Sequence, residues 1–106
     1  MKRLLAAALA VTALSSFAQG YPGSKPITIV VPFAAGGPTD RVARDLAEAM
    51  RKTLGGGANF VVENVNGAGG TIGATKVAKA APDGHTLLLY HIGMASTPAL
   101  YRKLQY

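Results

Sequence analysis

The chain has 106 residues, no cysteine and no tryptophan, and its 11 basic and 5 acidic side chains give a net charge of +6. The length suits one small domain or a piece of a larger one. Without cysteine there is no disulfide framework, no thiolate nucleophile and no cysteine-based metal site. The basic side chains are spread along expected helix surfaces without interleaved aromatic residues, so we expect no nucleic-acid partner.

Residues 1–18 have the pattern of a secretory signal peptide. Two basic residues precede an apolar run over residues 4–14, and Ser16-Phe17-Ala18 forms a small-x-small cleavage site. The apolar run is too short to span a bilayer. An uncleaved N-terminal helix is the alternative. We therefore expect export out of the cytoplasm, with a mature protein that begins at residue 19.

The segment at residues 27–40, ITIVVPFAAGGPTD, organises the rest of the chain. Its β-branched start predicts a strand buried on both faces, over residues 27–33. Small residues and glycines then predict a tight turn, and Pro-Thr-Asp supplies chemistry typical of a helix start, including a hydroxyl that can cap. In an open α/β sheet, ligands bind at the carboxyl ends of strands, where free N–H groups at helix N-termini form an anion site.

The remaining elements follow in regular alternation. The pattern predicts a helix over 39–54, a strand over 59–64, a glycine-rich turn over 65–71, a helix over 72–81, a strand over 86–90, a loop over 91–97 and a helix over 98–104 with Pro98 at its first position. This βαβαβα order predicts an α/β fold with a parallel sheet and right-handed crossovers. By analogy with doubly wound sheets we expect the strand order 2-1-3, which places the three loops after the strands on one rim.

Both predicted helices have an expected buried face. In the first, apolar residues recur every four positions, with two alanines beside them; these are Val42, Leu46, Met50 and Leu54, then Ala43 and Ala47. In the second, Ile72, Val77 and several alanines are expected to face inward.

Three parallel strands would leave two open sheet edges, and such edges template unwanted pairing. A sheet this small also buries a modest fraction of its surface. We therefore expect residues 19–106 to be the N-terminal part of a larger protein.

The glycines at residues 67–73 do not form a dinucleotide-binding motif. A G-x-G-x-x-G match from Gly67 requires glycine where Ile72 stands, and no acidic residue follows about 20 positions later. The chain also has no P-loop. The remaining interpretations are a tight turn that serves packing, or a backbone loop that approaches a ligand closely. Two such loops in succession favour binding.

Neither helix start carries a capping box, because Thr39 is followed three residues later by Val42 and Thr71 by Ala74. The first N–H groups are therefore open to water or to a carboxylate. Asp40 either compensates the helix dipole, which we favour, or meets a donor group of the ligand or a water.

The two histidines have different expected roles. His85 follows a turn and should lie at the surface, whereas His91 follows the third strand and should face the rim, as a ligand contact or in a structural hydrogen bond. No third side chain with metal-ligand spacing accompanies them, so we expect no metal and no cofactor. Ser96 follows no nucleophile elbow, and no catalytic triad can be assigned, so we expect no enzyme.

Six motifs resemble one known family. They are YP at 21–22 with KPI at 25–27, VVPFAAGGPTD at 30–40, VVEN at 61–64, GAGGTIGA at 67–74, APDGHTLLL at 81–89 and PALYRKL at 98–104. In this order and spacing the chain resembles the start of the periplasmic solute-binding proteins of tripartite tricarboxylate transporters, the Bug family. Members are longer, with two α/β lobes that close on a ligand, so the resemblance implies that this chain supplies the first part of the first lobe and lacks the hinge and second lobe.

The resemblance implies a periplasmic receptor for small carboxylates of the di- or tricarboxylate class, monomeric when full length, with membrane transporter subunits as partners. Carried over by motif, the ligand-binding residues are Ala35, Gly36, Gly37, Thr39 and Asp40 in the first loop and Ala68, Gly69, Gly70 and Thr71 in the second. His91 and Ser96 are candidates in the third loop, which departs from the family's Ser/Thr-rich form. The alternatives are a fragment of a secreted α/β enzyme, such as a hydrolase, and a truncated product without function.

Overall fold

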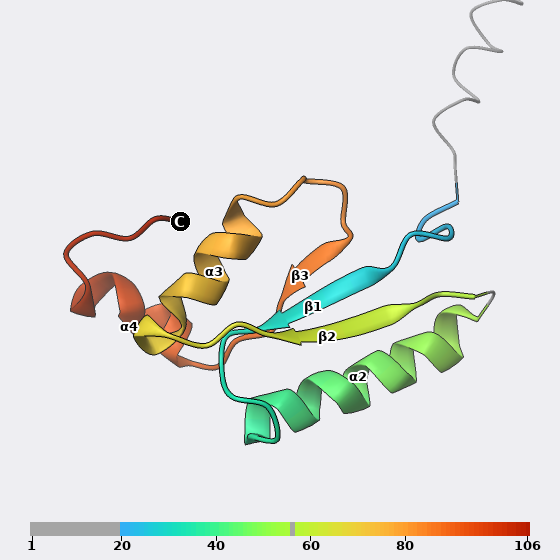
Figure 1. Cartoon of the computed structure of the whole chain (residues 1–106), viewed down its shortest axis with the longest axis horizontal. Helices are drawn as coiled ribbons and strands as arrows, with labels where there is room; N and C mark the ends of the chain where they lie inside the picture. Colours follow the sequence, from blue (N-terminus) through green and yellow to red (C-terminus); the bar gives the residue numbers. More distant parts are fainter. Residues whose placement is uncertain (1–19, 56) are drawn as a thin grey trace, which may run out of the picture.

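The computed structural model describes residues 20–55 and 57–106 (Figure 1). The expected signal peptide at 1–18 and the expected mature start at Gln19 lie outside these residues. In chain order the elements are β1 (Ile27–Val31), α2 (Pro38–Leu54), β2 (Phe60–Asn64), the 3₁₀ turn η2 (Ala68–Gly70), α3 (Thr71–Ala78), β3 (Thr86–Leu88) and α4 (Gly93–Leu100). None of the described helices combines the length and apolar character needed to cross a membrane.

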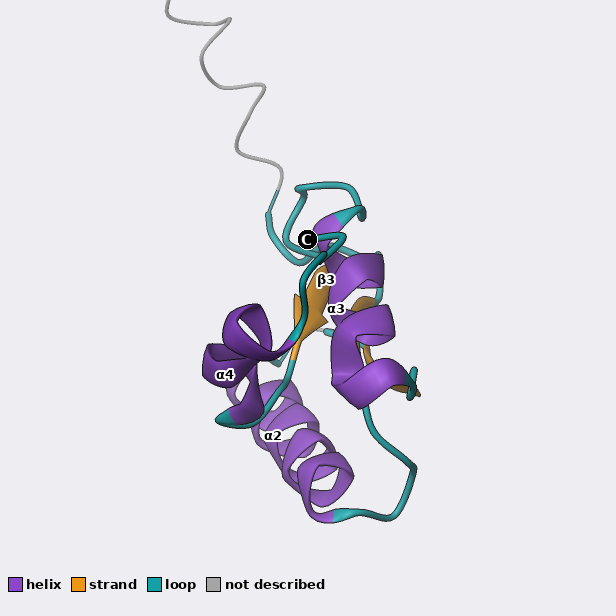
Figure 2. Ribbon diagram, turned by 90° about the vertical axis from the view of Figure 1, so that its left-hand side faces the viewer, coloured by secondary structure: helices purple, strands orange, loops and turns teal. Residues whose placement is uncertain are grey.

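The three strands form one parallel sheet in the order β2-β1-β3, which confirms the predicted fold class and strand order. Ile27 to Val31 pair in register with Phe60 to Asn64 on one side, and residues 28–30 pair with residues 86–88 on the other. The first crossover runs from β1 to β2, and the second runs back across the sheet from β2 to β3. Two right-handed crossovers in opposite directions place α2 and α3 on opposite faces of the sheet. Figures 1 and 2 show this arrangement, with α4 at the end where the strands finish.

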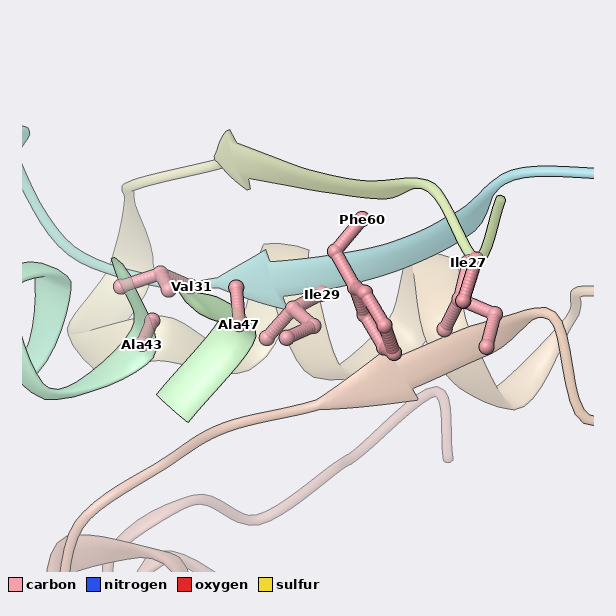
Figure 3. Packing of buried hydrophobic residues seen from close by; sticks show 7 residues of the cluster. Ile27, Ile29, Val31, Ala43, Ala47 and Phe60 are labelled. Carbon is pink, nitrogen blue, oxygen red and sulfur yellow. The ribbon is translucent and has the colours of Figure 1, made fainter. Parts of the chain in front are cut away.

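The core lies between β1 and α2. Ile27, Ile29 and Val31 are at most 2% exposed, and Ala43 and Ala47 of α2 pack against them (Figure 3). The alanines let the helix backbone approach the sheet closely. This corrects the predicted helix face in part, because the larger residues of the four-residue repeat, Val42, Leu46 and Leu54, are exposed. Only Met50 of that repeat packs at the margin of the core.

The starts of α2 and α3 also differ from expectation. Pro38 is the first residue of α2, as its fixed φ favours, but the N-cap is Gly37 and no side chain caps the helix, so Thr39 is not the cap. In α3 the buried residues are Gly73 and Ala74, whereas Ile72 is exposed. Gly73 is required because a Cβ there would meet the Pro32 side chain and the Val65 carbonyl oxygen.

The third unit, which is β3, α4 and the residues that follow each of them, departs most from prediction. Residues 91–97 were expected to form a loop and Pro98 to begin a helix, but α4 begins at Gly93 and Pro98 lies inside it. The helix has only eight residues, so proline removes one hydrogen bond from a short ladder. Thr97 anchors it, since this residue is buried and its hydroxyl donates to the Gly93 carbonyl oxygen at 2.7 Å.

The opposite end of the sheet is held by the N-terminal lead-in. The Tyr21 hydroxyl donates to the Gly84 carbonyl oxygen at 2.6 Å, and Lys25 pairs with Asp83. His85 was expected at the surface, but its side chain is only 13% exposed, and its Nε2 lies 3.0 Å from the Pro22 carbonyl oxygen. These contacts fix the end of the sheet that faces away from the rim.

Candidate functional site at the carboxyl rim of the sheet

The residues predicted for the site come from three loops at one end of the sheet. We call this end the rim. The first loop (residues 32–37) leads from β1 into α2, the second (65–70) from β2 into α3, and the third (89–92) from β3 into α4 (Figure 1). Parallel strands place all three carboxyl ends at the same edge, so the topology brings the two predicted helix starts together.

The first loop turns on glycine. Gly36 has a left-handed φ of 81°, and the Gly37 amide donates to the Ala34 carbonyl oxygen at 3.4 Å. The Gly36 amide donates to the Asp40 carboxylate at 2.8 Å. Among the described residues, the amides of Thr39 and Asp40 have no hydrogen-bond acceptor. The start of α2 therefore presents two free donors at its positive dipole end.

The Asp40 carboxylate is buried and hydrogen-bonded within the chain. It is 2% exposed and accepts hydrogen bonds from the Gly36 amide, from Arg44 Nε at 3.0 Å and from Asn64 Nδ2 at 3.0 Å. The Arg44 hydrogen bond, then the Gly36 and Asn64 bonds, hold the pKa of Asp40 well below its ordinary value. Asn64 also donates to the Phe33 carbonyl oxygen at 3.1 Å, so this network ties the ends of β1 and β2 together.

This network also compensates the negative charge of Asp40. The Arg44 guanidinium contacts both carboxylate oxygens, so the charge of Asp40 is compensated within the chain. The main-chain donors at the start of α2 therefore have no unpaired negative charge behind them among the described residues.

The second loop has an unusual backbone. Four consecutive residues have positive φ, namely Gly67 (131°), Ala68 (46°), Gly69 (63°) and Gly70 (94°). A positive φ is uncommon for alanine and is held there by surrounding contacts. The Gly70 amide donates to the Gly67 carbonyl oxygen at 2.9 Å, whereas the amides of Ala68 and Gly69 have no acceptor within the described chain.

Two tyrosines from the third unit hold the second loop. The Tyr90 hydroxyl donates to the Gly69 carbonyl oxygen, and the Tyr101 hydroxyl donates to the Ala68 carbonyl oxygen at 3.1 Å. A Cβ at Gly69 would collide with the Tyr101 hydroxyl, and one at Gly70 with the Tyr90 ring. The glycines of this loop therefore admit the tyrosines as well as the backbone conformation.

The third loop contributes an aromatic group. The His91 ring stacks on Phe33, with centroids 4.4 Å apart, and lies edge-on to Tyr90. His91 Nδ1 accepts the Gly93 amide at 2.8 Å, so in the neutral ring the proton is on Nε2, which is free to donate. Ser96 is exposed on α4, and its hydroxyl donates to the Gly93 carbonyl oxygen.

A shallow pocket of about 200 Å³ joins the first and third loops. Its lining residues are Pro38, Thr39, Val42, Leu89, Tyr90 and His91. A pocket of about 450 Å³ lies at the opposite end, between the lead-in and Asp83 and His85, away from every predicted ligand residue. No group of three His, Cys, Asp or Glu side chains gathers within the described ranges.

Sequence reasoning missed four residues that shape the rim: Arg44, Asn64, Tyr90 and Tyr101. Arg44 stands four residues after Asp40 on the same helix, a spacing that signals an ion pair. Asn64 and Tyr90 each stand at the end of a predicted strand. Nothing near Tyr101 in the sequence marks its contact with a loop 33 residues earlier.

Comparisons with known proteins agree with this architecture. Residues 42–106 match the model of the tripartite tricarboxylate transporter family receptor. A UPF0065 protein of Agrobacterium vitis is 55% identical over 98% of this chain, which covers 30% of that protein. The chain thus spans about a third of the length of the curated relatives it matches.

Solved structures are similar as well. The periplasmic binding protein BugD has a TM-score of 0.75 and 59% identity, and 81% of this chain covers 28% of it. MatC from Rhodopseudomonas palustris, solved with malate, has a TM-score of 0.71 and 53% identity, with 81% of this chain over 29% of MatC. An R. palustris protein solved with adipate has a TM-score of 0.73 and 38% identity, with coverages of 82% and 28%.

Proposed function

This chain belongs to the tripartite tricarboxylate transporter receptor family, the Bug family, and from that premise we propose that it is the first part of a periplasmic receptor for small di- or tricarboxylates. The full-length receptor would be a monomer that delivers its ligand to the membrane subunits of a tripartite transporter. The expected signal peptide at residues 1–18 would direct its export. The family and its structural neighbours are solute-binding receptors, which supports a receptor over a secreted hydrolase fragment.

The observation that carries this proposal is that two loops at one rim present main-chain amides with no acceptor among the described residues. The start of α2 offers the free amides of Thr39 and Asp40, and the second loop offers those of Ala68 and Gly69. Main-chain donors at helix N-termini are suited to a carboxylate, because they combine hydrogen bonds with the positive end of the dipole. Small backbone residues let the ligand approach these donors closely.

In this proposal each of the three loops contributes different groups to ligand recognition. The first loop and the start of α2 would contribute main-chain groups of Ala35, Gly36, Gly37, Thr39 and Asp40. The second loop and the start of α3 would contribute main-chain groups of Ala68, Gly69, Gly70 and Thr71. His91 would donate its Nε2 proton from the third loop, and Ser96 would lie at the margin. The Asp40 side chain would stabilise the conformation of the first loop, and the Asp40 main-chain amide would bind the ligand.

Malate and adipate in two similar structures support the ligand class. Both are small dicarboxylates that differ in the length and polarity of the chain between the charges. A site built from main-chain amides recognises the carboxylate that they share. The groups that distinguish one acid from another would then lie in the remainder of the receptor.

The test is binding to the purified full-length receptor that contains these residues. Thermal unfolding is measured with L-malate, adipate, citrate and a neutral sugar, and hits are measured by calorimetry. A ligand at one hundred times its Kd should add about 2.7 kcal/mol to the free energy of unfolding. Stabilisation by carboxylates and not by the sugar is expected. Stabilisation by the sugar alone would reject the proposal.

A further inference from the structure

Two phenol hydroxyls from the residues that follow β3 and α4 donate to carbonyl oxygens of the second loop. Tyr90 follows β3 and Tyr101 follows α4, yet both hydroxyls reach carbonyl oxygens of the second loop. The two acceptors are consecutive, Ala68 and Gly69. The tyrosines therefore hold neighbouring peptide groups of the segment in which every φ is positive.

The two held peptide groups differ in what their amides do. A trans peptide group is planar, and its C=O and N–H point in opposite directions. The carbonyl held by Tyr90 belongs to the same group as the Gly70 amide, which already donates to the Gly67 carbonyl oxygen. That group is fixed at both ends.

The group held by Tyr101 is fixed at its carbonyl end only. The Ala68 carbonyl oxygen accepts the Tyr101 hydroxyl at 3.1 Å, the Thr71 hydroxyl at 3.0 Å and the Thr71 amide. The other end of this group is the Gly69 amide, which has no acceptor in the described chain. With three donors on the carbonyl oxygen, the Gly69 N–H is turned away from Tyr101.

We propose that Tyr101, supported by Tyr90, is a positioning residue that aims the Gly69 amide at the ligand carboxylate. This inference rests on the proposed function, because it assigns a role within the same site. It makes the third unit a determinant of affinity through the second loop. Neither tyrosine needs to contact the ligand.

The experiment compares three Tyr→Phe variants of the full-length receptor. Tyr101→Phe and Tyr90→Phe remove the two loop hydrogen bonds. Tyr21→Phe is the matched control, because its hydroxyl also donates to a glycine carbonyl in a positive-φ turn, Gly84, but at the opposite end of the sheet. Calorimetry with L-malate and adipate gives Kd, thermal unfolding gives Tm, and ¹⁵N NMR follows the Gly69 amide.

We expect Tyr101→Phe to weaken carboxylate binding roughly tenfold, and Tyr90→Phe to weaken it less. Tyr21→Phe should leave Kd unchanged even where its Tm falls as far. The ligand-induced shift of the Gly69 amide should shrink in Tyr101→Phe. A role in stability alone would lower Tm in all three variants and leave Kd and this shift as in the wild type.

Equal Kd values for the wild type and Tyr101→Phe would overturn the inference while leaving the proposed function intact. A wild type that binds neither carboxylate would overturn the proposed function, and this inference with it. If Tyr101→Phe does not fold, Tyr90→Phe decides, since it removes the hydrogen bond on the adjacent carbonyl: a Kd equal to that of the wild type would then overturn the inference.

Discussion

The first rim loop takes its shape from a buried charge within its own βα unit, whereas the second takes its shape from phenol hydroxyls of the next unit. Asp40, Arg44 and Gly36 lie within nine residues of one another, and their hydrogen bonds form as α2 forms. The second loop depends on Tyr90 and Tyr101, which are 21 and 33 residues away from their acceptors. Both arrangements leave main-chain amides at the same rim without an acceptor among the described residues.

The difference teaches that a site of backbone donors still depends on side chains. In the first loop a charged group is buried and compensated, so its contribution depends on pH and on Arg44. In the second loop neutral hydroxyls select one backbone conformation out of those that glycine permits. We therefore expect the first loop to lose its conformation when the Asp40 charge is removed, and the second when the tyrosine hydroxyls are removed.

The largest effect is expected from Asp40→Asn. The new amide group keeps the shape of the side chain but turns a donor toward Arg44 or the Gly36 amide, and the Arg44 charge loses its partner. We expect Tm to fall by several degrees and malate binding to weaken at least tenfold, roughly. Glu48→Gln is the control, because Glu48 forms its ion pairs on the exposed face of the same helix. Equal effects from both variants would contradict the role of Asp40.

A smaller effect is expected from Gly70→Ala, measured against Gly37→Ala. Gly70 has φ of 94° and faces Tyr90, whereas Gly37 has φ of −73°, and a Cβ there would lie 3.3 Å from the Ala34 carbonyl oxygen. Gly70→Ala should lower the free energy of unfolding by about 2 kcal/mol, and Gly37→Ala by about 1 kcal/mol or less.

Valine variants at the same two positions separate two explanations of the glycines. On sequence grounds, valine at Gly37 or Gly70 is expected to abolish binding by blocking the approach of the ligand to the backbone. The structure gives Gly70 a second reason, contact with Tyr90, and leaves Gly37 as the cleaner probe. Chemical denaturation with and without malate distinguishes them: loss of affinity without loss of stability in Gly37→Val would support close approach of the ligand.

His91→Phe tests the third loop with a smaller expected change. Phenylalanine retains the stacking on Phe33 but removes the Nε2 donor, so Kd should rise by roughly threefold, in line with the loss of one modest hydrogen bond. Ser96→Ala is the comparison, because its hydroxyl already donates to Gly93 and has no proton left for a carboxylate. A larger loss from Ser96→Ala than from His91→Phe would reverse this assignment.

The smallest effect concerns acid stability. Asp40 and Asp83 both have folded-state pKa values below the ordinary 3.8, with Asp83 at about 2 because of its hydrogen bond to Lys25 and the His85 amide. A lowered folded-state pKa contributes stability above the unfolded-state value, and this stability is lost as pH falls through the folded-state value. Asp83→Asn should therefore flatten the loss of stability between about pH 4 and pH 2 slightly, and Asp40→Asn should flatten it more. Unfolding midpoints measured across this pH range test the prediction. A steeper loss of stability with falling pH in either variant would contradict the lowered pKa values.

The sheet could be predicted from sequence because local patterns and topology rules agree. The β-branched run at 27–31 and the alternation of strands and helices predicted the parallel sheet, and the analogy with doubly wound sheets supplied the order β2-β1-β3. Periodicity included Ala43 and Ala47 in the buried face of α2, but it could not exclude their larger neighbours Val42 and Leu46, which are exposed. Which residues of α2 are buried depends on how closely the helix backbone approaches the sheet, and this close approach leaves room only for alanine side chains.

Position along the chain also limited what could be predicted at the site. The glycine turns before α2 and α3 are local features, and the parallel sheet brings them to one rim as predicted. The start of α4 was predicted wrongly because proline is favoured at the first position of a helix. In the structure the helix begins at Gly93 and includes the buried Thr97 before Pro98. The tyrosine contacts with the second loop depend on the complete fold and have no local signal.

The most direct test is a crystal structure of the full-length receptor with malate. A carboxylate oxygen is predicted within about 3.2 Å of the Gly69 amide nitrogen, and another near the Thr39 or Asp40 amide, directly or through one ordered water. Malate held by side chains elsewhere, with no carboxylate oxygen near either loop, would contradict the account.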